Sequence, residues 1–157
     1  MTDDPVWTWR REDIVAHYTQ GNCHVFAAAM QSLTGLPMGI MWNPFEWHIE
    51  PDARGRGGVR EVIHVYVQTP DGRVIDIKGR RSLEKMKRDM AGDDWKACPC
   101  EPLSAARLSA LINDSENLAP FYEDEIKEAL EVIDRTPSLA LVVRKHRRAE
   151  KKARKTA

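Results

Sequence analysis

Three residues of this chain have side chains that together could perform nucleophilic chemistry: Cys23, His64 and Asp76. A thiol becomes a strong nucleophile when an imidazole takes its proton, and a carboxylate can hold that imidazole in the required orientation. The order of three common residue types says little by itself. The prediction gains weight from the position that each residue takes on its expected helix or strand.

Cys23 is expected at the start of a helix that runs to Leu33 and ends at Gly35. The segment Gln20-Gly21-Asn22 interrupts the preceding pattern, and the Asn22 side chain is a suitable acceptor for the first free amides of a helix. A glycine can take the left-handed conformation that closes a helix. Unsatisfied amides and the positive end of the helix dipole would favour the thiolate form of the cysteine.

His64 and Asp76 are expected on two neighbouring strands, Val62–Gln68 and Arg73–Lys78. The connecting loop Pro70-Asp71-Gly72 fits a three-residue hairpin, in which a type I turn is followed by a left-handed residue. In that register the histidine and the aspartate point to one face as diagonal neighbours, roughly 7–8 Å apart at the backbone. A register shifted by one residue would send the aspartate to the opposite face.

Five further residues are candidates for oxyanion or substrate binding: Gln20, Asn22, Tyr66, Trp42 and Trp47. The backbone amide of Cys23 is a candidate oxyanion donor, and Gln20 and Asn22 lie beside it. Tyr66 shares the face of the hairpin histidine. The two tryptophans flank the polar segment 43–61, which is long enough to be a functional lid or a disordered connection. Ordinary packing of large rings under a loop explains them equally well.

Each member of the trio also has an ordinary structural explanation. Cys23 falls on the apolar stripe of its helix and can be a small core residue. His64 can be a hydrogen-bonded sheet histidine, and Asp76 can simply pair with Lys78 or an arginine. Because the residue order and the hairpin register agree with one another, catalysis is favoured over three separate coincidences.

Three segments, Gly-Asn-Cys-His at a helix start, then His-Val-Tyr-Val, then Asp-Gly-Arg-Val-Ile-Asp, resemble the papain-like fold in its transglutaminase-like arrangement. That group includes thiol peptidases, amidases, glutamine deamidases, transglutaminases and arylamine acetyltransferases. The resemblance covers residues 20–80 and implies Cys23 as nucleophile, His64 as base and Asp76 as the residue that orients the base. It implies no metal and no cofactor. Gln20 lies closer to the cysteine than the oxyanion glutamine of papain, and the chain is short for an acetyltransferase or a full transglutaminase.

The expected fold class is α+β, with the Cys-bearing helix packed on a small antiparallel sheet and further helices toward the C-terminus. The length of 157 residues fits one domain, residues 1–143, followed by a basic and flexible tail, residues 144–157. Additional strands are expected at Met38–Trp42 and Ser138–Val143. Additional helices are expected at 11–18, 82–90, 104–112 and 121–133.

Cys98-Pro99-Cys100 raises two alternatives, a zinc site with Cys23 and His24 or a redox pair. Structural zinc sites draw on pairs of ligands spaced by two to four residues, and neither segment has that spacing. The redox alternative lacks one residue of the familiar motif. Two loop cysteines near a proline turn are the plainer explanation. An odd number of cysteines without a regular framework favours a cytoplasmic location.

The formal net charge of zero conceals a strong asymmetry. Residues 144–157 hold eight Lys or Arg and one Glu, so the preceding residues carry a net charge of −7. The tail can bind nucleic acid phosphates, lie along the acidic helix expected over Glu123–Asp134, or stay solvated. It has no Phe, Tyr or Trp for base stacking, so nucleic acid contact would be weakly specific. No apolar run is long enough to span a bilayer, and no secretory signal is recognised.

The sequence therefore predicts a thiol-dependent hydrolase or acyl-transfer enzyme of the peptidase, amidase or glutamine deamidase type. It would act on an amide or related acyl bond of a protein or peptide through a thioester on Cys23. Two alternatives remain open: a non-catalytic protein-binding module on the same fold, and a nucleic-acid-associated protein that uses the basic tail.

Overall fold

The computed structural model describes residues 4–44, 61–114 and 118–156. The helices are α1 (Arg11–Thr19), α2 (Cys23–Thr34), α3 (Leu83–Ala91), α4 (Ala105–Asp114), α5 (Glu123–Arg135) and α6 (Pro137–Thr156), with short 3-10 segments η1 (Val6–Thr8) and η2 (Gly92–Ala97). The strands are β1 (Met38–Trp42), β2 (Val62–Gln68), β3 (Arg73–Asp76), β4 (Gly79–Ser82) and β5 (Cys100–Leu103). The expected α+β class is confirmed.

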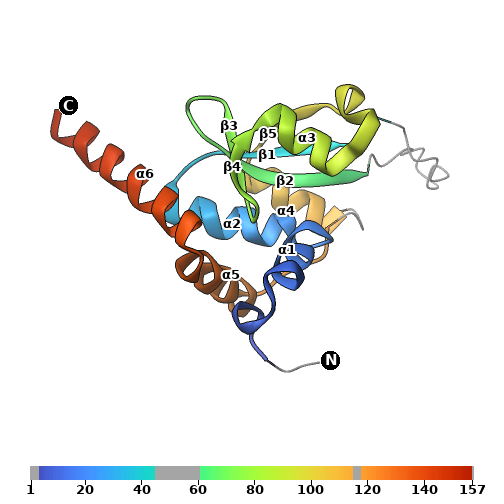
Figure 1. The fold of residues 1–157 in the computed structure, drawn as a ribbon. Coiled ribbons are helices and arrows are strands. Elements are labelled where there is room, and N and C mark those ends of the chain that lie inside the picture. The colour runs from blue at the N-terminus through green and yellow to red at the C-terminus, as the bar shows by residue number, and fades with distance from the viewer. Residues whose placement is uncertain (1–3, 45–60, 115–117, 157) are drawn as a thin grey trace.

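The five strands form one antiparallel sheet in the order β4-β3-β2-β1-β5. Helix α2 packs on one face, with α5 behind it, and α3 covers the other face (Figure 1). Side chains of β1 and β2 therefore enter two separate cores, because successive residues of a strand point to opposite faces. Ile40, Val65 and Val67 lie in the core on the α2 side, and Met41 and Tyr66 lie in the core on the α3 side.

The hairpin between β2 and β3 has the register that its turn residues predict. Val67 lies opposite Ile75 and Gln68 lies opposite Val74. Gly72 has φ +81°, the left-handed conformation that the third loop residue requires. The pairing stops there, and β3 ends at Asp76 rather than at Lys78, because the chain turns at once into β4. The two strands therefore part as they run toward His64 and Asp76.

Five predicted helices, α1 to α5, begin and end within two residues of their expected positions. In α2 the predicted stop is confirmed as well, since Gly35 has φ +71° and donates its amide to the carbonyl of Gln31. The apolar residues of these segments recur at helical spacing, which is the strongest local signal in a sequence.

The strand predicted over Ser138–Val143 is wrong, because these residues form the first turns of α6. Pro137 takes the first helical position, where a proline costs no hydrogen bond. Leu139 and Val143 are four residues apart and both face the core. The helix continues through Arg144, where the tail was expected to begin, and runs to Thr156.

Two strands, β4 and β5, lie in segments that the sequence did not identify. β4 is polar and carries two arginines, and it extends the sheet by antiparallel pairing with β3. β5 contains Pro102 and lies at the opposite edge, where a proline is tolerated because one side of the strand is unpaired. Among the described helices, none is long and apolar enough to cross a membrane.

Candidate active site

Cys23 is the first residue of α2, and its side chain is 5% exposed. The capping role predicted for Asn22 is wrong: its side chain accepts no hydrogen bond from the helix, although its carbonyl accepts the first one, from Phe26. Amides of the first helical turn therefore remain available beside the thiol. Such amides and the helix dipole favour a negative charge at this position.

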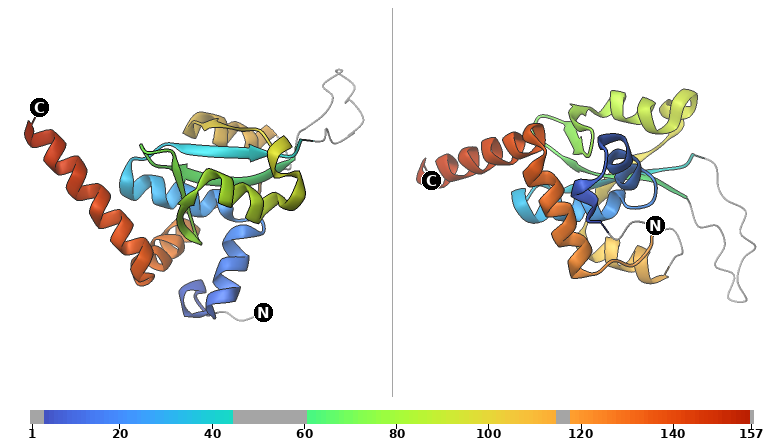
Figure 2. Two further views of the ribbon diagram at one scale, coloured as in Figure 1. Left: turned by 45° about the horizontal axis from the view of Figure 1, so that its top comes forward. Right: turned by 60° about the horizontal axis from the view of Figure 1, so that its bottom comes forward.

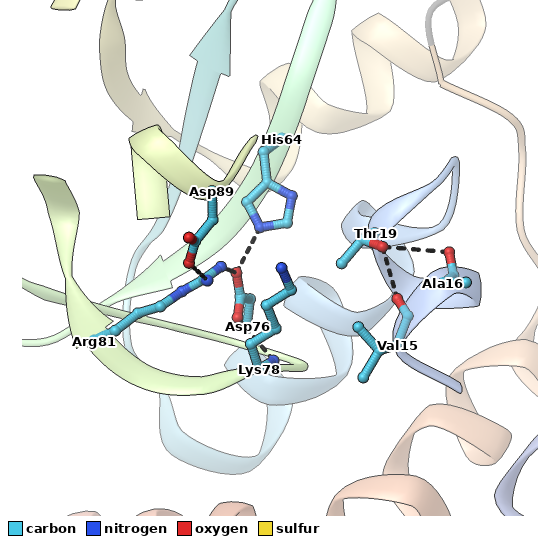
Figure 3. Close-up of polar contacts among 8 residues, drawn as sticks. All are labelled: Val15, Ala16, Thr19, His64, Asp76, Lys78, Arg81 and Asp89. Atoms are coloured by element: carbon cyan, nitrogen blue, oxygen red, sulfur yellow. Dashed lines mark hydrogen bonds and ion pairs between the residues drawn. The ribbon is translucent and has the colours of Figure 1, made fainter. Parts of the chain in front are cut away.

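His64 and Asp76 are brought together as the hairpin register predicts. Nε2 of the histidine lies 2.8 Å from Oδ2 of the aspartate, and both side chains are buried. The ring comes from β2 and the carboxylate from the end of β3, where the two strands have separated (Figure 3). This contact assigns a proton to Nε2, because a carboxylate at its usual charge can only accept. Nδ1 is left facing away from the aspartate.

Asp76 has two further partners, Lys78 and an arginine, as its ordinary structural explanation suggests, although the sequence did not identify which arginine. Its Oδ1 accepts the backbone amide of Lys78 at 2.9 Å, and its Oδ2 accepts from Nη2 of Arg81. Nη1 of Arg81 donates in turn to Asp89 of α3. Figure 3 shows this chain of contacts from Asp89 to His64. The arginine is 7% exposed and lies between two carboxylates, so it holds Asp76 in its ionised form.

The thiol of Cys23 and the ring of His64 shift the pKa of one another. Burial alone would raise the pKa of Cys23, but contacts with the rings of His24 and His64, the positive charge of His64 and the Val65 amide lower it to about 6. Burial alone would lower the pKa of His64, but Asp76 and Cys23 raise it to about 9. Each of the two groups therefore favours the charged form of the other, which is the direction that a thiolate–imidazolium pair requires.

The ionised form of Asp76 is likewise stabilised by its neighbours. Burial alone would raise the pKa of Asp76, but the hydrogen bonds and charges of His64 and Arg81 hold it below its usual value. Nδ1 of His64 is buried and makes no hydrogen bond of ordinary geometry with any described residue. This nitrogen is therefore the one available to exchange a proton with the sulfur or with a bound substrate.

His24 lies next to Cys23 and is fully buried, with its ring edge-on to Phe121 at 5.5 Å between centroids. Its Nε2 is 2.8 Å from the carbonyl of Ala119, which can only accept, so this nitrogen carries the proton. Nδ1 has no hydrogen-bond partner within the described ranges. The second imidazole beside the thiol is a feature that the sequence analysis considered only as a zinc ligand.

A hollow of about 510 Å³ opens beside the trio. Its walls are formed by Thr19, Gln20, Glu61, Val62, Ile63, Lys78, Asp89 and Met90. Ile63 precedes His64, and the backbone of Lys78 bonds to Asp76. The Lys78 side chain extends between Thr19 and His64 (Figure 3). A larger hollow of about 700 Å³ lies along α1 and shares only Gln20 with the first.

The substrate-binding candidates are distributed differently from what the sequence suggests. Gln20 is exposed and lines the hollow, and Asn22 is half-buried next to Cys23. Trp42 is buried and donates from Nε1 to Glu101 at 3.0 Å. Tyr66 is a core residue whose ring covers Gly39 on β1. Trp47 lies outside the described residues.

The other two cysteines lie away from this site. Cys98 and Cys100 pack in the core between α3 and the sheet, whereas Cys23 belongs to the core on the α2 side. All three cysteines are free. Among the described residues, no group of three His, Cys, Asp or Glu side chains converges on a position that could hold a metal ion.

Arg81 is a residue of this site that the sequence did not reveal. It lies on β4 opposite Val74, so its side chain shares the face of Val74 and of Asp76, two residues further along β3. The strand was hidden because the segment Gly79–Ser82 has no apolar pattern typical of a strand.

Comparison of the chain with family models, curated proteins and solved structures finds no match.

Proposed function

We propose that this protein is a thiol-dependent hydrolase or acyl-transfer enzyme of papain-like, transglutaminase-like type. Its substrate would be an amide or related acyl bond of a protein or peptide. The single observation that carries the proposal is the buried His64–Asp76 pair, with 2.8 Å between ring nitrogen and carboxylate, beside a Cys23 thiol whose pKa the same histidine lowers. We expect the reaction in the cytoplasm, in keeping with three free cysteines.

In the first half of the reaction, the Cys23 thiolate attacks the carbonyl carbon of the substrate and forms a tetrahedral oxyanion. The imidazolium of His64 then gives its Nδ1 proton to the leaving nitrogen, the carbon–nitrogen bond breaks, and a thioester remains on the sulfur. Asp76 keeps its charge throughout and compensates the positive charge of the ring. The leaving amine departs through the hollow beside the histidine.

In the second half, a water molecule or an acceptor amine attacks the thioester and loses a proton to Nδ1 of His64. The carbon–sulfur bond breaks, and the thiolate–imidazolium pair is restored. The oxyanion of both steps would be stabilised by the backbone amide of Cys23 at the first turn of α2. The exposed Gln20 in the wall of the hollow is the side chain positioned to assist.

A second candidate is a non-catalytic binding module on the same fold. The observation that favours it is the low exposure of Cys23, because only 5% of this residue is accessible to solvent. In that case the thiol would be a core residue, and the hollow lined by Gln20 and Lys78 would bind a partner without reacting. The two candidates differ in the reactivity that they predict for the thiol.

Alkylation with iodoacetamide at about pH 6, followed by mass spectrometry, distinguishes the two candidates. We expect rapid and selective modification of Cys23, which is lost in His64→Ala. Cys98 and Cys100 are internal controls, because burial raises the pKa of both thiols. Equal and slow labelling of all three cysteines would contradict the enzymatic proposal and favour the binding module.

A further inference from the structure

The outer part of α6 carries a dense set of exposed cations. They are Arg144, Lys145, Arg147, Arg148, Lys151, Lys152, Arg154 and Lys155, and all eight are exposed. The helix stays beside the end of α2 and the β2–β3 hairpin as far as Ala149, and its last turns project away from the sheet and the other helices (Figures 1 and 2). These cations therefore face solvent over the whole outer half of the helix.

All eight cations lie on one half of the helix surface, because α-helices have about 3.6 residues per turn. We call this half the basic face. The opposite half carries Ala149, Ala153, Thr156, His146 and a single acid, Glu150. It continues the stripe by which Leu139 and Val143 pack on the body. The charge distribution is therefore one-sided and points away from the domain.

Most of this charge is not neutralised within the protein. Arg154 pairs with Glu150 at 3.2 Å, and Arg147 donates to the carbonyl of Leu33 at the end of α2. The other six cations make no ion pair with any described residue. The acidic helix α5 contacts α6 only near the bend at Thr136 and forms no ion pair with the basic face in the described part of the chain (Figure 2).

The charge density of the basic face resembles that of a nucleic acid duplex. From Arg144 to Lys155 the helix rises about 17 Å at 1.5 Å per residue. A duplex carries one phosphate charge per roughly 1.7 Å of its axis, so about ten phosphates lie along the same length. The width of an α-helix also fits the major groove of B-DNA.

We propose that the basic face of α6 binds the phosphate backbone of a nucleic acid duplex. The helix from Arg144 to Thr156 has no Phe, Tyr or Trp for stacking on unpaired bases. Insertion into a lipid surface needs large apolar side chains opposite the charges, and this helix has alanines and a threonine there. A duplex backbone is the anionic partner that requires neither aromatic side chains for stacking nor large apolar side chains for insertion.

The test is fluorescence anisotropy of the full chain with a labelled duplex of about 20 base pairs and random sequence, at salt from about 50 to 200 mM. With five or six phosphate contacts, log K should fall with log salt at a slope of about −5, a loss of about a thousandfold over this range. Cys23→Ala should bind equally well, because binding does not depend on the proposed enzymatic activity.

The variant that removes the interaction replaces four lysines of the basic face by glutamine: Lys145, Lys151, Lys152 and Lys155. Glutamine and lysine have similar helix propensities, so circular dichroism should show an unchanged helix content. We expect at least a tenfold loss of duplex affinity at low salt and a slope reduced to about half.

The matched control replaces four exposed or half-exposed lysines elsewhere by glutamine: Lys85, Lys87, Lys96 and Lys127. It changes the net charge by the same amount, and its affinity should stay within about threefold of the wild type. An equal loss in this control would overturn the proposal, because the binding would then depend on total charge. Absence of binding at about 50 mM salt would also overturn it. So would tighter binding to phosphatidylcholine vesicles with about one third phosphatidylserine.

Discussion

Replacing Asp76 by asparagine should convert the thiolate of Cys23 into an ordinary thiol at neutral pH. The pKa of His64 is raised from 6.5 to about 9, and the hydrogen bond to Asp76 is the first of the contacts that raise it. Without the carboxylate, burial becomes the dominant influence and lowers the pKa of the ring. The histidine then loses its positive charge, which is one of the contacts that lower the pKa of the cysteine.

The size of the effect follows from the two limiting pKa values of Cys23. At a pKa of about 6 the thiol is about 90% ionised at pH 7, and at the ordinary value of 9.0 it is about 1% ionised. The rate of alkylation at pH 7 should therefore fall by between about tenfold and about ninetyfold in Asp76→Asn. Above about pH 9.5 the two proteins should react at similar rates, because both thiols are then ionised.

The assay is the rate of iodoacetamide modification of Cys23 as a function of pH, followed by mass spectrometry. Asp71→Asn is the matched control, since Asp71 lies in the same hairpin but is exposed and pairs with Arg80 at the surface. Its profile should equal that of the wild type. The reasoning is refuted if Asp76→Asn leaves the midpoint of the profile unchanged, or if Asp71→Asn moves it equally.

Two further predictions concern stability. Arg81→Met removes one of the two buried cationic partners of Asp76, so urea unfolding should reveal a loss of about 3 kcal/mol, whereas the exposed neighbour Arg80→Met should cost no more than about 1 kcal/mol. Equal losses would mean that burial of the ion pair does not matter. Gly39→Ala should cost about 1–3 kcal/mol in the same measurement, because the Tyr66 ring occupies the space of a new methyl group. An unchanged midpoint would show that the ring can move aside freely.

The hairpin and the Cys-bearing helix could be predicted because short segments determine both. Pro70-Asp71-Gly72 allows one turn geometry, and that geometry fixes the register that brings His64 to Asp76. Gly35 ends α2 by its left-handed conformation, as a local rule predicts. In both cases the residues that determine the hairpin register or the end of the helix lie within a few positions of it in the sequence.

The first turns of α6 were mistaken for a strand because Ser138–Val143 is a short apolar run. Such a run has no measurable period, and it fits a buried strand as well as a helix. The packing of Leu139 and Val143 on the body decides in favour of the helix. That packing depends on residues distant in the chain, so the segment alone does not determine whether it forms a helix or a strand.

The residues that surround Cys23, His64 and Asp76 were harder to predict than these three residues themselves. Tyr66 was expected beside the substrate because it shares a sheet face with His64, but α3 covers that face and makes the tyrosine a core residue. Arg81 was missed because β4 forms by pairing with β3 and not by its own propensity. Both errors concern tertiary contacts, since the covering of a sheet face and the pairing of a polar strand depend on residues outside the segment.

The most direct test of the central claim is a pH titration of the thiolate absorbance of Cys23 in the ultraviolet. The signal is the difference between the wild type and Cys23→Ala, so the other two cysteines cancel. The account predicts a midpoint near pH 6 that moves upward when His64 is also replaced by alanine. A midpoint at or above the ordinary thiol value of 9.0, unaffected by the histidine, would contradict it.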